Sequence, residues 1–395
     1  MDFLNRWLLN AEKEGLCREL TPVSREVGRP ISVAVREGFQ SLFDFSSNDY
    51  LALSHHPALS AAALEALNKY GTGAGSARLM SGDLEIFHQL ENETALLKGN
   101  EAALLFGSGY LANVGVIPAL VGRGDTIFTD RLNHASIYDG CRLSGARLVR
   151  FRHNDIDHLE TMLRKNSGAG RSLLIVESVY SMDGDICPLA DLVALKNRFS
   201  TLLMVDEAHA TGVFGSSGGG VISREGVEQD VDVAMGTYGK ALGSYGAYVS
   251  GTALMIRFLL NRARSFVFTT ALPPAVAAAS LAAVRLVRNE PSRREKLFVK
   301  ATCFKEALRN GGVSGIPGPS QIVPLMVGDN HQAVLLADEC RRQGVFATAV
   351  RPPTVPAGEA RLRFSVTLHH SHQDLIDTAG KIVSISEKLS IPLSF

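Results

Sequence analysis

Short apolar runs alternate with helix-length segments through the middle of the chain. Segments such as Ile156–Lys165 and Pro188–Arg198 separate the runs, and this alternation is typical of a largely parallel sheet covered by helices. The link Gly243–Gly246 is too short for a crossover, so we expect the last strand to pair antiparallel at an edge. The expected strands are Ala103–Phe106, Thr126–Thr129, Arg147–Phe151, Leu173–Glu177, Leu202–Val205, Val231–Met235 and Ala247–Ser250.

The pattern changes after Val287, where strands and helices no longer alternate regularly. The expected elements there are a charged helix Ser292–Arg309, a strand Ile322–Val327, a helix His331–Gln343 and strands near Val345–Ala349 and Arg361–Ser365. We therefore predict a three-layer α/β/α domain with a mostly parallel sheet, followed by a smaller α+β domain. The expected divisions are an N-terminal helix and extended segment at 1–50, the large domain at 51–287 and the C-terminal domain at 288–395.

Two apolar segments are each predicted to be a helix that packs on the protein and does not enter a membrane. Near the N-terminus, Phe3, Leu4, Trp7 and Leu8 fall on one helical face, which predicts an amphipathic helix that docks on the body of the protein. The Ala-rich stretch at 271–287 is predicted to be a buried helix, because about 20 strongly apolar residues are needed to cross a bilayer.

Charge and cysteine content narrow the possible partners and compartment. The 40 Lys and Arg residues balance the 40 Asp and Glu residues, so the chain has no overall field that would attract nucleic acid or a membrane surface. Its 5 cysteines are odd in number and include no C-x-x-C pair, which argues against a disulfide framework or structural zinc. We expect a cytoplasmic protein without a metal site.

Lys240 and Asp206 are the most informative pair of residues. Lys240 lies in the small-residue segment Thr237–Gly243, where its amine can approach a flat ligand. Asp206 ends the strand Leu202–Val205 and therefore emerges at the carboxyl edge of the sheet, where α/β proteins bind ligands. A lysine that forms a Schiff base and an Asp that pairs a pyridinium nitrogen are the recurring partners of pyridoxal 5'-phosphate (PLP). Either residue alone could equally be a surface lysine or a strand-end aspartate.

Glycine-rich turns suggest where a phosphate could bind. Ser108, Gly109 and Tyr110 follow a strand and precede a helical pattern, so backbone N–H groups and the helix dipole would face an anion there. Many such turns only reverse the chain. The second glycine-rich stretch, Gly71–Ser76, does not complete a dinucleotide-binding fingerprint, because its last position is Ser and no strand precedes it.

Other strand-end loops each offer one further polar group. His134 could stack on a flat cofactor, and His209 and Ser181 could hydrogen-bond a phenolic oxygen on the same ring. A polar loop histidine is the competing interpretation of His134. We interpret His369, His370 and His372 as a solvated surface run rather than a ligand cluster.

Together these loops resemble the α-oxoamine synthase family, which are fold type I PLP enzymes. The resemblance runs from about residue 16 to the C-terminus, with the motifs in the expected order. The motifs are Phe45–Leu51, Ser108–Tyr110, Asn133–Ser136, Ser181–Gly184, Asp206–His209 and Thr237–Lys240. Within the family, Arg351–Gly358 and Val327–Asn330 resemble the member of the biotin pathway that uses L-alanine and a pimeloyl thioester.

The resemblance implies a role for each matching residue. Lys240 would form the internal aldimine and later move the Cα proton, Asp206 would keep the ring nitrogen protonated and His134 would stack on the ring. Phosphate contacts would come from Ser108, Gly109, Tyr110 and Thr237, with Thr270 from a neighbouring subunit, and the phenolic oxygen would be held by His209 and Ser181. Arg363 would hold the amino-acid carboxylate, and Arg18, Asn48, His134 and Thr354 would contact substrate.

The implied reaction is a decarboxylative condensation of an amino acid with an acyl thioester, in a homodimer whose subunits share active sites. The acyl carrier could be coenzyme A or an acyl carrier protein. A sister enzyme that uses glycine or serine, or a different acyl group such as acetyl, would carry similar motifs. A non-catalytic protein of the same fold is also compatible with them, and a nicotinamide-dependent oxidoreductase is a more distant possibility.

Overall fold

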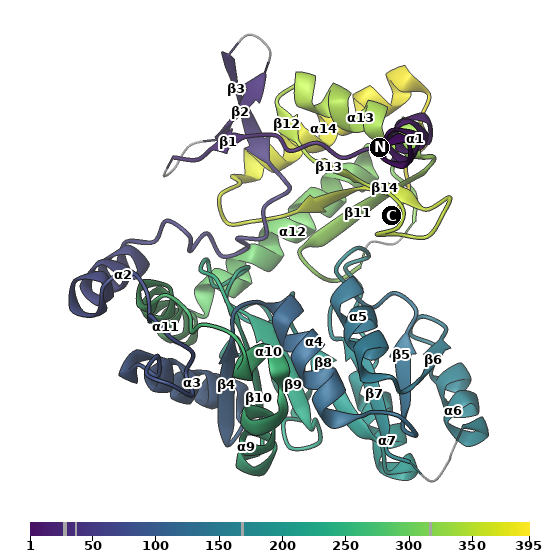
Figure 1. The fold of residues 1–395 in the computed structure, drawn as a ribbon. Coiled ribbons are helices and arrows are strands. Elements are labelled where there is room, and N and C mark those ends of the chain that lie inside the picture. Colours follow the sequence, from purple (N-terminus) through teal and green to yellow (C-terminus); the bar gives the residue numbers. More distant parts are fainter. Residues whose placement is uncertain (27–29, 36–37, 167–169, 316–317) are drawn as a thin grey trace. The chain divides into compact units, whose positions relative to one another are not determined.

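The computed structural model describes residues 1–26, 30–35, 38–166, 170–315 and 318–395, and it contains two compact units. The small unit comprises residues 1–50, 182–185 and 296–395, and the large unit comprises residues 51–181 and 186–295. The N-terminal 50 residues therefore belong to the same compact unit as the C-terminal 100 residues. Figure 1 shows the elements of each unit.

The large unit is built on a seven-stranded sheet in the order β4-β10-β9-β8-β7-β5-β6. Strands β5 to β9 pair in parallel, whereas β10 pairs antiparallel with both β9 and β4. The strands are β4 (Ala102–Phe106), β5 (Thr126–Asp130), β6 (Arg147–Phe151), β7 (Ser172–Glu177), β8 (Leu202–Asp206), β9 (Val233–Thr237) and β10 (Ala247–Gly251).

The antiparallel pairing of the last strand is confirmed, but its expected edge position is wrong. Strand β4 pairs along the outer side of β10, with Ala247 opposite Phe106, so β4 is the edge of the sheet. Pairing between β4 and β10 joins segments far apart in the sequence, which the local pattern does not encode. The strand expected at Val231–Met235 begins two residues later, at Val233, because the Asp232 carboxylate accepts a hydrogen bond from the Leu203 N–H at 2.7 Å.

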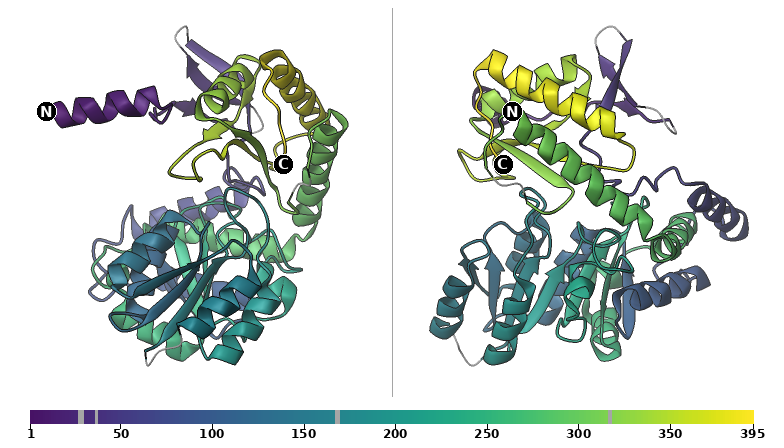
Figure 2. Two further views of the ribbon diagram at one scale, coloured as in Figure 1. Left: turned by 90° about the vertical axis from the view of Figure 1, so that its right-hand side faces the viewer. Right: turned by 180° about the vertical axis from the view of Figure 1, so that it is seen from behind.

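Helices lie on both sides of this sheet, as two further views show in Figure 2. Strands β7 and β8 are therefore buried on both faces and are nearly continuous apolar runs, as expected for covered parallel strands. Each fully buried Leu, Ile or Val contributes about 1.5–3 kcal/mol. The helices are α2 (Pro57–Tyr70), α3 (Glu85–Lys98), α4 (Gly109–Leu120), α5 (Ala135–Ser144), α6 (Ile156–Lys165), α7 (Leu189–Phe199), α8 (Val221–Glu225), α9 (Ala253–Arg262), α10 (Arg264–Val267) and α11 (Pro274–Asn289). The buried helix expected near 271–287 is confirmed as α11.

The small unit contains two sheets, helices α1, α13 and α14, and the part of helix α12 from residue 296 onward. One sheet has the order β1-β2-β3-β12, and the other is antiparallel with the order β11-β14-β13. The strands are β1 (Val23–Ser24), β2 (Ile31–Val35), β3 (Gly38–Asp44), β11 (Ile322–Gly328), β12 (Val345–Phe346), β13 (Thr348–Val350) and β14 (Ala360–Ser365). The helices are α1 (Asp2–Lys13), α12 (Ser292–Asn310), α13 (Asn330–Arg342) and α14 (His372–Leu389).

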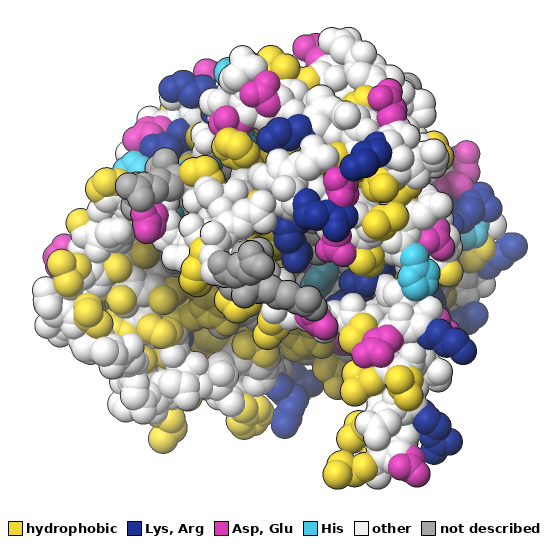
Figure 3. All heavy atoms as spheres, turned by 90° about the horizontal axis from the view of Figure 1, so that it is seen from above, with side chains coloured by type: hydrophobic (Ala, Val, Ile, Leu, Met, Phe, Trp, Pro, Cys, Tyr) yellow, Lys and Arg dark blue, Asp and Glu magenta, His cyan; other side chains and the backbone are white. Residues whose placement is uncertain are grey.

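Helix α1 forms as expected, but the docking predicted for its apolar face is wrong. Phe3 and Trp7 are 69% and 67% exposed, and Ala11 is the one buried residue of the helix. The view in Figure 3 shows hydrophobic side chains exposed along this helix, which protrudes at the lower right. The amphipathic pattern predicts the helix correctly but does not identify a surface within the chain that would cover it.

The interpretation of His370 as part of a solvated run is also wrong. Its ring is 3% exposed and stacks on Phe45, with centroids 4.1 Å apart. The Thr367 N–H donates to Nδ1 at 3.1 Å, and Nε2 lies 3.1 Å from the Asp44 carbonyl oxygen. Two contacts of this kind fit a neutral ring that accepts at Nδ1 and donates at Nε2. Burial accordingly lowers the pKa of His370 to about 4.

Candidate active site

A cavity of about 190 Å³ opens in the large unit where β5, β7, β8 and β9 end. Parallel strands bring their carboxyl ends to one edge of a sheet, and ligands bind at that edge in α/β proteins. The register places Glu177 opposite Asp206 and Asp206 opposite Met235. The lining residues are Gly109, Tyr110, Asn113, His134, Ser136, Glu177, Asp206, Ala208, His209, Met235, Thr237 and Lys240.

Lys240 reaches into this cavity from a turn held by Thr237. The Thr237 hydroxyl donates to the Gly246 carbonyl at 2.8 Å and accepts from the Gly239 N–H at 3.0 Å. Lys240 Nζ lies 2.7 Å from His209 Nε2. A primary amine fixed by the backbone of a tight turn is well placed to react with an aldehyde bound in the cavity.

Asp206 is 4% exposed and is fixed by two donors. Its Oδ1 accepts from the Ala208 N–H at 2.9 Å, and its Oδ2 accepts from the Asn113 amide at 3.0 Å. Both bonds stabilise the carboxylate while leaving lone pairs free for a further donor. A buried carboxylate beside a pyridine nitrogen favours the protonated, positively charged ring.

His134 is connected to Asp206 through a short relay of side chains. Asn113 donates one amide hydrogen to Asp206 and the other to the Ser136 hydroxyl at 2.9 Å. The Ser136 hydroxyl lies 2.7 Å from His134 Nδ1, which also accepts from the Ser136 N–H at 3.2 Å. Nδ1 is therefore an acceptor and the proton of the neutral ring lies on Nε2. Desolvation, followed by the charge of Lys240, lowers the pKa of His134 and favours this neutral ring.

Glu177 is a second buried carboxyl group beside Asp206. It is 2% exposed, and its Oε1 accepts from the His134 N–H at 2.5 Å. Burial raises the pKa of Glu177 well above its usual value, and the negative charge of Asp206 raises it further. Both effects favour the neutral form of Glu177 beside the Asp206 carboxylate.

The phosphate side of the site is the first turn of α4. Ser108 caps this helix by accepting from the Leu111 N–H at 3.2 Å, and Gly109 and Tyr110 line the cavity. The Tyr110 hydroxyl donates to the Asp139 carboxylate at 2.7 Å. Unpaired N–H groups in the first turn of a helix attract anions. Amine, buried carboxylate and helix N-terminus thus surround one cavity, and this set of groups fits PLP.

The structure brings most, but not all, of the predicted cofactor residues to this cavity. Ser108 lies one residue outside the lining, and Ser181 is buried but is not part of it. Thr270 lines a separate cavity of about 20 Å³ that it shares with Arg78 and Gly107.

The predicted substrate residues other than His134 belong to the small unit. Arg363 is 8% exposed and donates to Asn48 Oδ1 at 3.2 Å, to the Tyr50 hydroxyl at 3.2 Å and to the Ser365 hydroxyl at 2.8 Å. The strand β14 alternates, so its arginines lie on the face opposite Leu362 and Phe364. Arg18 and Thr354 are both exposed and lie 3.4 Å apart.

Three polar lining residues were given no role from the sequence: Asn113, Ser136 and Glu177. Asn113 is a polar residue inside the otherwise apolar helix α4, and its 0% exposure explains why it needs partners. Glu177 ends a hydrophobic strand in the same way as Asp206 does. In the sequence, Asn113 could have been noticed as a polar residue within an otherwise apolar helical segment.

The described ranges contain neither a metal cluster nor a membrane-spanning helix. No group of three or more His, Cys, Asp or Glu side chains there could hold a metal ion. Among the described helices, none is both long enough and apolar enough to cross a membrane.

The chain is similar to proteins of known family along nearly its whole length. Residues 40–382 match the family model "Aminotransferase class I and II". The 8-amino-7-oxononanoate synthase of Geobacter sulfurreducens is 47% identical over 386 residues, which cover 97% of this chain and 98% of that protein.

Solved structures support the same relationship. Serine palmitoyltransferase (SPT) with a PLP internal aldimine has a TM-score of 0.91 and 30% identity, and the match covers 98% of each chain. An 8-amino-7-oxononanoate synthase from Francisella tularensis has a TM-score of 0.77 and 30% identity, over 89% of this chain and 99% of that one. The predicted fold type I architecture is confirmed by these neighbours.

Proposed function

We propose that this chain, which belongs to the class I and II aminotransferase family and is related to 8-amino-7-oxononanoate synthases, condenses L-alanine with a pimeloyl thioester. It is a PLP-dependent acyltransferase, and the products of the proposed reaction are 8-amino-7-oxononanoate, carbon dioxide and the free thiol carrier. The observation that carries the proposal is the convergence of Lys240 and Asp206 on one cavity beside the N-terminus of α4. This reaction is the carbon–carbon bond-forming step expected of a biotin-pathway enzyme.

PLP, when bound, supplies an aldehyde for the amino group and an electron-poor ring that weakens the bonds at Cα. Lys240 would hold the aldehyde carbon and, once displaced by alanine, take the Cα proton as a general base. Asp206 would keep the ring nitrogen protonated. A new bond then joins Cα to the thioester carbonyl carbon, the C–S bond breaks, the carboxyl group leaves as carbon dioxide, and Lys240 returns a proton to Cα.

The remaining predicted residues would bind and orient. His134, neutral through its Ser136 contacts, presents a flat face on which the ring could stack. His209 and Ser181 would hold the phenolic oxygen, and Ser108, Gly109, Tyr110 and Thr237 would hold the phosphate. We assign the amino-acid carboxylate to Arg363, because a guanidinium can donate two parallel hydrogen bonds to a carboxylate and its bonds to Asn48 and Tyr50 hold it in place. Arg18, Asn48 and Thr354 are the proposed further substrate contacts.

We also propose that the active form is a homodimer, with Thr270 acting on the phosphate of the neighbouring subunit. Met80 and Phe268 are 79% and 71% exposed, and a homodimer interface would cover large apolar side chains of this kind. Light scattering after size-exclusion chromatography tests this, and a monomeric holoenzyme with full activity would contradict it.

All 5 cysteines are free thiols, which supports the proposed cytoplasmic location.

The experiment that tests the proposed reaction is a substrate panel. Release of free thiol is measured for L-alanine, glycine and L-serine, each with pimeloyl-CoA, a pimeloyl acyl carrier protein, acetyl-CoA and palmitoyl-CoA. We expect the highest kcat/KM with L-alanine and a pimeloyl thioester. A higher value with glycine and acetyl-CoA would instead identify a sister enzyme.

A second candidate is condensation of serine with a long acyl thioester. The observation in its favour is the TM-score of 0.91 to SPT, against 0.77 to the F. tularensis enzyme. The sequence favours the first candidate, because identity is 47% to the Geobacter enzyme and 30% to SPT. A preference for L-serine and palmitoyl-CoA in the same panel would reverse this order.

A further inference from the structure

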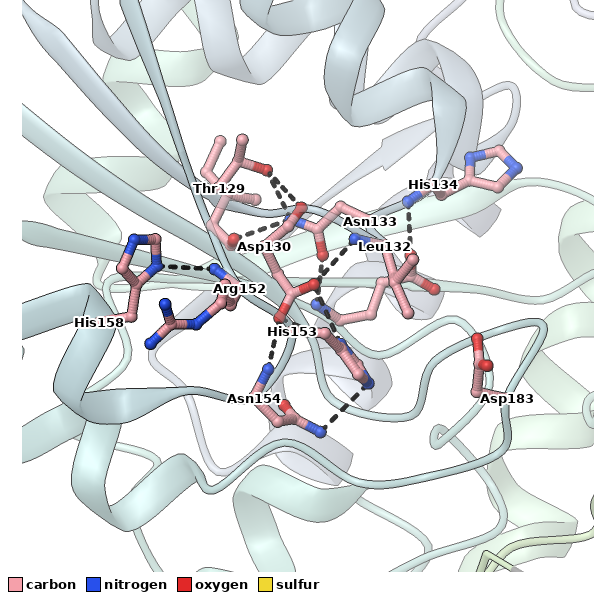
Figure 4. Close-up of polar contacts among 12 residues, drawn as sticks. Thr129, Asp130, Leu132, Asn133, His134, Arg152, His153, Asn154, His158 and Asp183 are labelled. Atoms are coloured by element: carbon pink, nitrogen blue, oxygen red, sulfur yellow. Dashed lines mark hydrogen bonds and ion pairs between the residues drawn. The ribbon is translucent and has the colours of Figure 1, made fainter. Parts of the chain in front are cut away.

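A buried carboxylate at the end of β5 anchors the loop that carries His134. Asp130 is 0% exposed, and its Oδ1 accepts from the Leu132 N–H at 2.8 Å. Its backbone carbonyl also accepts, from the Asn133 N–H at 3.3 Å and from the Tyr138 hydroxyl at 3.0 Å. One residue thus holds the two loop positions directly before His134, as Figure 4 shows.

Every backbone N–H from residue 131 to residue 134 has an acceptor. Arg131 donates to the Phe151 carbonyl at 3.1 Å, and His134 donates to Glu177 at 2.5 Å. The Asn133 side chain adds bonds to the Thr129 hydroxyl at 2.7 Å and the Ile175 carbonyl at 2.8 Å. Loops normally leave some backbone groups to water, so a loop with all four N–H groups paired is held in one conformation.

The loop after β6 also binds the Asp130 carboxylate. His153 Nδ1 lies 3.0 Å from Asp130 Oδ1, and the Asn154 N–H donates to Oδ2 at 2.9 Å. A carboxylate only accepts, so Nδ1 of His153 is the donor. The His153 ring in turn packs edge-on against Tyr180, with centroids 4.4 Å apart. Its side chain is 17% exposed, so the pair is largely shielded from water.

We propose that Asp130 and His153 are positioning residues, which fix the His134 ring at the height and angle needed to pack on the cofactor. Neither side chain lines the cavity, so they act through the 131–134 loop and not on substrate. The inference rests on the proposed function, because it takes His134 to stack on PLP. Displacing a catalytic group by about 1 Å can cost up to about a hundredfold in rate.

Three substitutions of histidines in this region separate positioning from general stability. His153→Leu removes the donor to Asp130, whereas His153→Asn retains an N–H close to the position of Nδ1. His158→Leu is the matched control, because His158 accepts from the Arg152 N–H at 2.9 Å but does not touch Asp130. Asp130→Asn is a fourth variant, which puts an amide donor opposite the donors of His153 or Asn154 and leaves the shape unchanged.

The measurements are the circular dichroism induced in the PLP absorption band, and kcat and KM for the amino acid, all on holoenzyme. We expect His153→Leu and Asp130→Asn to weaken the induced band and lower kcat by about tenfold or more, with KM changed less than about threefold. His153→Asn and His158→Leu should behave like the unmodified protein. If His153→Leu does not fold, Asp130→Asn and His153→Asn still test the inference.

An unchanged induced band and an unchanged kcat in His153→Leu or Asp130→Asn would overturn this inference but would leave the proposed function standing. Equal losses in His153→Leu and His158→Leu would also overturn it, because they would indicate a general effect of loosening the loop after β6. If the unmodified protein bound no PLP, the proposed function would fail and this inference with it.

Discussion

Lys240 Nζ and His209 Nε2 lie 2.7 Å apart, although 31 residues separate them in the chain. The contact joins the loop after β9 to the loop after β8, and Asp206 ends β8 itself. One pair of neighbouring strands therefore supplies the amine, the group that holds it and the carboxylate for the ring nitrogen. The chemistry of the site depends on this pairing of strand ends.

Lys240→Ala should abolish catalysis while leaving PLP able to bind. The alanine variant has neither the amine that holds the aldehyde nor the base for the Cα proton, so kcat should fall by more than about a hundredfold. The visible absorption band of the lysine-bound cofactor should also disappear. Lys388→Ala is the control, because that lysine is 70% exposed and lies 3.7 Å from Glu339. Full turnover by Lys240→Ala would contradict the assignment.

Glu177→Gln should retain most of the activity. Burial and the nearby Asp206 raise the pKa of Glu177 and so favour the neutral carboxylic acid, and a glutamine amide is neutral with nearly the same shape. We expect kcat within about threefold of the unmodified protein, whereas Glu177→Leu removes the acceptor of the His134 N–H and should cost about tenfold or more. A large loss in the Gln variant would show that Glu177 acts as an anion.

Arg363→Ala should weaken amino-acid binding without changing the cofactor spectrum. The guanidinium does not line the cofactor cavity, and a charge-assisted hydrogen bond contributes about 1.5–3 kcal/mol. KM for the amino acid should therefore rise about 10- to 100-fold. Arg363→Lys, which keeps the charge but not the paired donors, should have a KM between those of the unmodified protein and of Arg363→Ala. An unchanged KM in Arg363→Ala would show that another residue binds the amino-acid carboxylate.

Stability should fall as the pH drops through the range set by His370. The pKa of its buried ring is about 4 in the folded protein and about 6.5 in the unfolded chain, so the unfolded state binds more protons between these values. The contribution of the neutral ring is complete above about pH 6.5 and is lost as the pH falls toward 4, by about 3 kcal/mol in total. Urea unfolding at pH 7.5, 6 and 5 measures this, with His370→Gln as the comparison. An equal loss in His370→Gln would assign the pH dependence to other groups.

The sequence predicts the sheet of the large unit well because its strands are locally marked. Leu173–Glu177 and Leu202–Val205 are apolar runs bounded by polar residues, and both strands form within one residue of those limits. The edge position of β4 could not be predicted, since it depends on pairing with β10 across about 140 residues of sequence.

The site follows the same division between local and long-range information. Lys240, Asp206 and His134 are visible as strand-end loops, but the relay through Asn113 and Ser136 depends on how α4 packs beside α5. His370 shows the converse error, because a run of polar residues in the sequence includes one that becomes buried. Its burial depends on Phe45, more than 300 residues away.

The most direct test of the central claim is identification of the product by mass spectrometry. The purified protein is incubated with PLP, L-alanine labelled with carbon-13 at the carboxyl carbon, and pimeloyl-CoA. We predict 8-amino-7-oxononanoate without the label, one labelled carbon dioxide for each product molecule, and an equal amount of free coenzyme A. A product that retains the labelled carboxyl carbon, or release of coenzyme A without a carbon–carbon bond, would contradict the account.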